Sequence, residues 1–135
     1  MKIYFAASIR GGRDDQGLYL EIVSLLKDYG EVLTEHIADV KISQMGEMEA
    51  NDFIYERDMG WLKESDIVVA EVTTPSLGVG YELGIAETLK KKVLCLYRES
   101  PERSLSAMVR GNKVFQVVDY KELEDLKEIF DKFLK

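Results

Sequence analysis

Two acidic residues occupy positions that a packed helix normally fills with apolar side chains. Glu82 stands at helical spacing from an apolar stripe formed by Ile85, Ala86 and Leu89. Asp58 shares one helical face with Ile54, Trp61 and Leu62. A carboxylate on such a face is costly unless it is paired or faces a cleft. Two inward carboxylates are also the usual equipment for cleaving a glycosidic bond, one as the nucleophile and the other as the acid.

Both carboxylates also have an ordinary structural interpretation. We expect Glu82 in the first turn of a helix over residues 80–91, where an acidic side chain commonly complements the helix dipole. Asp58 could form a buried salt bridge, with Arg57 or Arg10 as its partner. If Asp58 lies in a cleft instead, partial burial would raise its pKa and suit it to donate a proton. The residues alone leave both interpretations open.

Two loops have the composition of an anion site. The segment Ser8–Arg13 (Ser-Ile-Arg-Gly-Gly-Arg) offers a hydroxyl, two guanidinium groups and a flexible backbone, a combination that suits phosphate. The segment Thr73–Glu82 is a Ser- and Gly-rich entrance to a helix, whose free N–H groups favour anions. Neither segment has the spacing of a Walker loop or a dinucleotide fingerprint. The first could equally be a surface turn with solvated arginines.

Short apolar runs alternate with amphipathic stretches along the whole chain. We expect strands at residues 3–7, 31–35, 66–72, 93–97 and 114–118. Helices are expected at 15–29, 47–65, 80–91 and 121–134, with a short one inside 104–111. This alternation predicts one α/β domain over residues 1–135, a doubly wound, Rossmann- or flavodoxin-like parallel sheet of five strands in the order 2-1-3-4-5. Such sheets bind ligands where the strand order reverses, and here that point lies between the two anion-friendly loops.

The bulk properties limit the class of partner. A chain of 135 residues with a net charge of −7 and a pI of about 4.8 is a poor binder of a nucleic-acid polymer, although a small phosphorylated ligand is compatible with it. The single cysteine, Cys95, excludes an internal disulfide, and no apolar run reaches membrane-spanning length. We expect a cytoplasmic location. The lone histidine, His36, and the absence of a Cys/His/Asp cluster predict no metal site.

Four segments together resemble one known family. Residues 4–13, 32–36, 69–84 and 105–111 are similar to the 2′-deoxynucleoside 5′-phosphate N-hydrolases, which belong to the nucleoside 2-deoxyribosyltransferase superfamily. The first and last of these segments favour the hydrolase branch over the transferases. The resemblance implies hydrolysis of the N-glycosidic bond of 2′-deoxynucleoside 5′-monophosphates to free base and 2-deoxyribose 5-phosphate. It also implies that no metal or organic cofactor is needed.

The resemblance implies a role for each matching residue. Glu82 matches the nucleophile that attacks C1′ and forms a 5-phospho-2-deoxyribosyl enzyme, Asp58 the carboxylate that assists departure of the base, and Tyr4 a tyrosine beside the nucleophile. Positions that bind the substrate and its phosphate match Ser8, Ile9, Arg10, Gly11, Ser76 and Gly78. Ser106 matches a serine that reaches the phosphate from the second subunit of a homodimer. Ala7 stands where a glycine is expected in mammalian members, which alters the fit around the substrate without removing a catalytic group.

Four other functions remain open at this point, one of which is a pure interaction domain that would bind no nucleotide. A nucleoside 2-deoxyribosyltransferase would pass the sugar to a second base, and the Ser/Arg set for phosphate argues against it. A ribonucleotide hydrolase would act on substrates such as CMP. A non-catalytic nucleotide-binding module would bind nucleotides without changing them. The residues do not choose the base.

Overall fold

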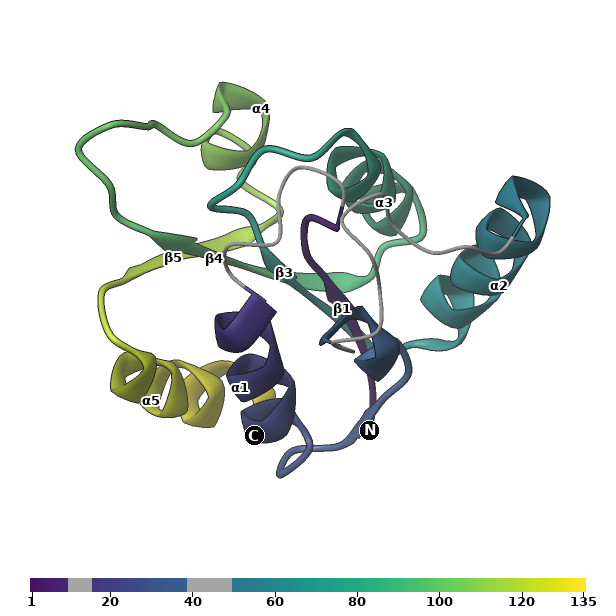
Figure 1. Cartoon of the computed structure of the whole chain (residues 1–135), viewed down its shortest axis with the longest axis horizontal. Helices are drawn as coiled ribbons and strands as arrows, with labels where there is room; N and C mark the ends of the chain where they lie inside the picture. Colours follow the sequence, from purple (N-terminus) through teal and green to yellow (C-terminus); the bar gives the residue numbers. More distant parts are fainter. Residues whose placement is uncertain (10–15, 39–49) are drawn as a thin grey trace.

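The computed structural model describes residues 1–9, 16–38 and 50–135 of the chain. Its centre is one parallel sheet with the strand order β2-β1-β3-β4-β5, which confirms the predicted fold class (Figure 1). Every neighbouring pair of strands in this sheet is parallel. The strands are β1 (Lys2–Ala6), β2 (Glu31–Val32), β3 (Ile67–Glu71), β4 (Lys92–Arg98) and β5 (Gln116–Tyr120).

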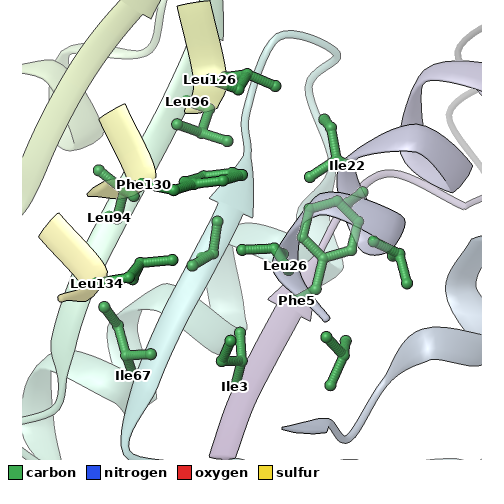
Figure 2. Packing of buried hydrophobic residues seen from close by; sticks show 14 of the residues in the cluster. Ile3, Phe5, Ile22, Leu26, Ile67, Leu94, Leu96, Leu126, Phe130 and Leu134 are labelled. Carbon is green, nitrogen blue, oxygen red and sulfur yellow. The ribbon is translucent and has the colours of Figure 1, made fainter. Parts of the chain in front are cut away.

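Helices cover both faces of the sheet. They are α1 (Gln16–Leu26), α2 (Asn51–Glu64), α3 (Leu77–Thr88), α4 (Ala107–Arg110) and α5 (Leu123–Leu134), with a 3₁₀ turn η1 (Glu35–Ala38). Helices α1 and α5 lie side by side on one face (Figure 1). Figure 2 shows the core beneath them, where the side chains of Leu126 and Phe130 from α5 point toward Leu94 and Leu96 of β4.

The opposite face of the sheet packs against α2 and α3. Side chains alternate along β1, so that Ile3 and Phe5 join the core under α1 and α5 whereas Tyr4 and Ala6 join the other core. That second core also contains Leu62 of α2. The alternation therefore points Tyr4 toward the two helices that carry Asp58 and Glu82.

The second strand is shorter than predicted. Only Glu31 and Val32 pair with β1, and the chain enters η1 at Glu35. The hydroxyl of the buried Thr34 donates to the Phe5 carbonyl at 2.6 Å and accepts from the Phe5 N–H at 2.8 Å. This side chain replaces the backbone pairing of a longer strand, so the prediction of a strand over 31–35 was wrong at its end.

Several other element boundaries differ from the prediction. Helix α1 ends at Leu26, three residues before its predicted end, because Gly30 is preceded by a turn in which the Tyr29 and Gly30 N–H groups both bond the Leu26 carbonyl. The fifth strand begins at Gln116 instead of residue 114, because Asn112 accepts from the N–H groups of Val114 and Phe115 and holds that segment in a turn. Helix α3 begins at Leu77 instead of Gly80, because the hydroxyl of Ser76 caps it. Helix α2 begins at Asn51, and residues 47–49 of its predicted range lie outside the described residues.

Candidate active site

The start of α3 lies at the carboxyl end of β3, where the strand order reverses. The Ser76 Oγ accepts a hydrogen bond from the Val79 N–H at 3.3 Å, and the Gly80 N–H bonds the Ser76 carbonyl at 3.1 Å. The N–H groups of Leu77 and Gly78, at the first two positions of the helix, have no acceptor within the helix. They and the helix dipole favour an anion at this point.

A buried network fixes the loop that leads to Ser76. Glu71, at the end of β3, is 1% exposed and accepts hydrogen bonds from the Thr73 N–H at 2.7 Å, from the Thr73 hydroxyl at 3.0 Å and from the Tyr120 hydroxyl. Burial raises the pKa of Glu71, and these hydrogen bonds act in the opposite direction. The Thr73 hydroxyl also accepts from the Arg98 N–H at 2.9 Å. The network ties the loop to the ends of β3, β4 and β5.

Glu82 is the sixth residue of α3, one turn further in than predicted. The influence of a helix dipole is concentrated in the first turn, so the dipole is not the principal influence on this carboxylate. The expectation that Glu82 occupies the first turn was therefore wrong. Because α3 begins earlier than predicted, Glu82 lies further from the first residue of the helix. Glu82 is half-buried at this position.

Glu82 and Tyr4 form a direct pair. The hydroxyl of the fully buried Tyr4 donates a hydrogen bond to Oε2 of Glu82. Burial raises the pKa of Glu82 to about 7, the hydrogen bond from Tyr4 opposes that rise, and the nearby charge of Asp58 adds to it. Burial and the same carboxylate raise the pKa of Tyr4, so the phenol stays protonated and remains a donor. Glu82 thus changes its charge near neutral pH.

Asp58 forms the predicted salt bridge with Arg57 and also lies on a cavity, and its predicted role as a proton donor stays a prediction. Its Oδ1 accepts from the Arg57 guanidinium at 3.0 Å, which is the structural salt bridge. The guanidinium of Arg57 lies over the ring of Trp61 at 4.9 Å and bonds Nε2 of His36 at 3.1 Å. Yet the Asp58 side chain keeps 22% of its surface exposed and lines the same cavity as Glu82. Asp58 therefore takes part in a salt bridge and also faces the cavity.

The cavity lies between α2 and α3 and measures about 630 Å³. This volume suits a small molecule. The predicted site residues that line it are Ile9, Asp58, Ser76, Gly78 and Glu82, and Ala7 also borders it. The structure therefore brings together the two carboxylates and the anion-friendly start of α3, as the sequence predicted.

The remaining predicted residues lie elsewhere. Ser8 is fully buried at the end of β1 and is not among the cavity-lining residues. Arg10 and Gly11 lie outside the described residues. Ser106 caps α4, accepting from the Met108 N–H at 3.2 Å, and lines a second cavity of about 520 Å³. That cavity lies on the other side of Ser76 and Leu77, which border both cavities.

Two aromatic residues of the first cavity were not predicted from the sequence. Tyr55 from α2 and Tyr81 from α3 line it, each about half exposed. Tyr55 stands three residues before Asp58, so helical spacing could have placed it on the same face. Tyr81 directly precedes Glu82 in the sequence. No pattern in the sequence indicates that the side chain of Tyr81 lies near Tyr55 of α2.

The described part of the chain offers no group of three or more His, Cys, Asp or Glu side chains able to hold a metal ion. The acidic side chains that line the first cavity are Asp58 and Glu82. Separately, none of the helices in residues 1–9, 16–38 and 50–135 has the length and apolar character needed to span a membrane.

A doubly wound sheet with a carboxylate pair in a cavity at its switch point defines an α/β protein with a small-molecule site. Within that class, the chain belongs to the nucleoside 2-deoxyribosyltransferase family, whose model matches residues 3–121. This result confirms the family resemblance predicted from the sequence.

Curated relatives match nearly the whole chain. A 5-hydroxymethyl-dUMP N-hydrolase from Esox lucius is 54% identical over 141 residues, covering 100% of this chain and 97% of that protein. The protein of the same name from Mus musculus is 58% identical over 127 residues, covering 90% and 73%. A putative 2′-deoxynucleoside 5′-phosphate N-hydrolase from Nematostella vectensis is 54% identical, covering 98% and 92%.

Two solved structures share the fold at low sequence identity. A CMP N-glycosidase from Clostridium botulinum superposes with a TM-score of 0.69 at 21% identity, covering 99% of this chain and 100% of that one. A 2-deoxyribosyltransferase from Bacillus psychrosaccharolyticus gives 0.67 at 18% identity, covering 94% and 90%. These similarities support the assignment of the fold.

Proposed function

We propose that this protein hydrolyses the N-glycosidic bond of 2′-deoxynucleoside 5′-monophosphates, releasing the free base and 2-deoxyribose 5-phosphate. The observation that carries the proposal is the carboxylate of Glu82, bonded by the Tyr4 hydroxyl and sharing one cavity with Asp58. The names of the curated relatives support the same activity. They also make 5-hydroxymethyl-dUMP the first substrate to test.

The chemistry proceeds in two displacements. The ionised carboxylate of Glu82 attacks C1′, the C1′–N bond breaks, and its electron pair leaves with the base. Asp58 gives a proton to the departing base; water then attacks C1′, passes a proton back to Asp58 and releases Glu82 as a carboxylate. The hydrogen bond from Tyr4 to Oε2 leaves Oε1 of Glu82 to approach the sugar. Asp58 faces the same cavity and assists departure of the base.

The phosphate binds at the start of α3 in this proposal. The hydroxyl of Ser76 and the first N–H groups of α3, near Gly78, supply donors where the helix dipole favours a negative charge. In this proposal the segment that follows β1 supplies the remaining contacts, from Ile9 on the cavity wall and from Arg10 and Gly11, whereas Ser8 is fully buried and supports this segment. A phosphate site at this position favours 5′-phosphorylated substrates over unphosphorylated nucleosides, which separates the proposed activity from that of nucleoside transferases.

We further propose that the protein acts in the cytoplasm as a homodimer of single-domain chains. Ser106 lines the second cavity, next to two almost fully exposed apolar side chains, Leu77 at 95% and Met108 at 83%. A second copy that covers this surface would bury both side chains. It would also bring the partner subunit's Ser106 toward the phosphate. Leu77→Glu should convert the dimer to monomers in sedimentation experiments and lower activity, and an unchanged dimer would contradict this arrangement.

The deciding experiment is a substrate panel followed by chromatography of the released base. The panel contains 5-hydroxymethyl-dUMP, the common 2′-deoxynucleoside 5′-monophosphates, CMP and unphosphorylated deoxynucleosides. We expect base and 2-deoxyribose 5-phosphate from deoxynucleotides only. Glu82→Gln should abolish the release, whereas Glu56→Gln, an exposed position on α2, should leave it unchanged.

The same panel tests the competing functions. A second free base can also be added to the reaction. If that base becomes attached to the sugar, the protein is a transferase. Release of cytosine from CMP at the same rate as from dCMP would identify a ribonucleotide hydrolase. Nucleotides that bind but remain intact would identify a binding module and overturn the proposed hydrolysis.

A further inference from the structure

Two tyrosines bridge the helices that enclose the cavity. Tyr55 belongs to α2 and Tyr81 to α3, and both line the cavity. Their exposed fractions are 50% and 52%, so both rings stand at its mouth rather than at its base. Their hydroxyl groups lie near each other, and the neighbouring Tyr55 hydroxyl raises the pKa of Tyr81. The two rings therefore face the mouth of the cavity together, one from each helix.

The position of these rings relative to the substrate follows from the proposed function, on which this inference rests. The phosphate lies at the start of α3, near Gly78, and C1′ lies at Glu82. The base extends from C1′ away from the phosphate and toward Asp58, which assists its departure. Tyr55 lies one turn closer to the start of α2 than Asp58 and on the same helical face. The rings therefore flank the space that the base enters.

We infer that Tyr55 and Tyr81 form an aromatic wall against which the base of the substrate packs. Planar rings bind planar bases by stacking, and every base offers a π face. The contact between the two hydroxyl groups limits the movement of the rings before the substrate arrives, which lowers the entropy cost of ordering the wall. The wall supplies affinity that is common to all bases, so selection among the bases falls to other groups in the cavity.

Binding measurements isolate the contribution of the wall. Titration calorimetry uses the Glu82→Gln protein, which binds without turnover, with dCMP, dGMP and 5-hydroxymethyl-dUMP as the probes. Tyr55→Leu and Tyr81→Leu should each weaken binding of all three nucleotides by roughly 5- to 100-fold, the range expected for loss of base stacking. The same variants should bind 2-deoxyribose 5-phosphate, which has no base, as tightly as the parent does.

Variants that retain the rings test the hydroxyl pair. Tyr55→Phe and Tyr81→Phe both remove the same contact between hydroxyl groups, so each should weaken nucleotide binding by a similar and smaller factor. The double Phe variant should be no weaker than either single variant. Phe53→Leu is the matched control, because Phe53 is equally exposed on α2 but is not among the residues that line the cavity. It should bind as the parent does.

The outcomes separate this inference from the function on which it rests. Nucleotide binding that is unchanged in both Leu variants would overturn the wall and leave the hydrolase intact. An equal loss of affinity for nucleotides and for 2-deoxyribose 5-phosphate would also overturn it, because the rings would then act on the cavity as a whole. A parent protein that bound none of the nucleotides would overturn the proposed function and the wall together.

Discussion

The hydroxyl of Tyr4 donates a hydrogen bond to the carboxylate of Glu82. Tyr4 comes from the first strand of the sheet and Glu82 from a helix 78 residues later, and the phenol is fully buried. A buried carboxylate needs such a donor, because burial alone favours its neutral form. The pair therefore holds the proposed nucleophile in a state that can ionise near neutral pH.

The first prediction concerns the pH dependence of the reaction. Because the pKa of Glu82 is about 7 and the nucleophile must be ionised, about half of the molecules are active at pH 7. Below pH 7, kcat/KM should fall about tenfold for each pH unit. Above about pH 8, Glu82 is almost fully ionised, so its titration should no longer change kcat/KM. A rate profile measured from pH 5 to 9 checks this. An acid limb centred near pH 4.5 would show that Glu82 has an ordinary pKa.

The second prediction concerns removal of the donor in Tyr4→Phe. The ring still fills its place in the core, but Glu82 loses the hydrogen bond that lowers its pKa. The acid limb should move upward by about one pH unit, so that kcat/KM at pH 7 falls about fivefold and recovers toward pH 9. Tyr97→Phe, whose hydroxyl bonds the Arg103 carbonyl, is the control. A loss of activity that is equal at every pH would contradict this role for Tyr4.

The strand–helix alternation predicted the sheet and its strand order because each element has its own hydrophobic period. The two carboxylates were found by the same spacing, since an acidic residue on an apolar helical face is conspicuous. The errors fell where a single side chain determined the local structure. The hydroxyl of Thr34 ended β2, and that of Ser76 started α3 three residues before the predicted position.

Other features of the site depend on packing and leave no local signal in the sequence. The contact between Tyr55 and Tyr81 depends on the separation of two helices that are distant in the sequence. The pKa of Glu82 depends on how deeply its side chain is buried. The predicted helix start was wrong by three residues, and this error placed Glu82 in the first turn, where the helix dipole would have been the main influence on its pKa.

The third prediction concerns stability. Glu82 has a pKa of about 7 in the folded protein against an ordinary value of 4.5, so the folded state holds its proton more tightly than the unfolded state. The contribution of Glu82 to the free energy of unfolding is fully present below about pH 4.5 and is lost as the pH rises through 7. The loss is of order 3 kcal/mol.

Glu82→Gln removes this penalty while keeping an acceptor for Tyr4. The variant should therefore gain thermal stability relative to the parent at pH 8, with a smaller difference at pH 5. Thermal unfolding of both proteins at the two pH values measures this gain. The same substitution abolishes activity in the proposed mechanism, so the inactive protein should be the more stable one. A difference that did not depend on pH would contradict the raised pKa.

The fourth prediction concerns Gly78, at the second position of α3 and on the cavity wall. A Cβ added there meets only the Ser76 Oγ, at an ordinary contact distance of 3.9 Å, so the fold accommodates alanine. Alanine also favours the helix, by up to about 1 kcal/mol. The new methyl group nevertheless lies beside the N–H groups that are proposed to hold the phosphate, where it hinders the approach of a bulky anion.

Gly78→Ala should therefore raise KM for deoxynucleoside 5′-monophosphates about tenfold, with the melting temperature unchanged or higher. Gly60→Ala is the matched control, because Gly60 is an exposed helical glycine with no atom within 4 Å of its added Cβ. It should leave KM unchanged. Steady-state kinetics and thermal unfolding of both variants measure these effects. An unchanged KM in Gly78→Ala would place the phosphate away from the start of α3, and a lower melting temperature would show that the glycine serves the fold.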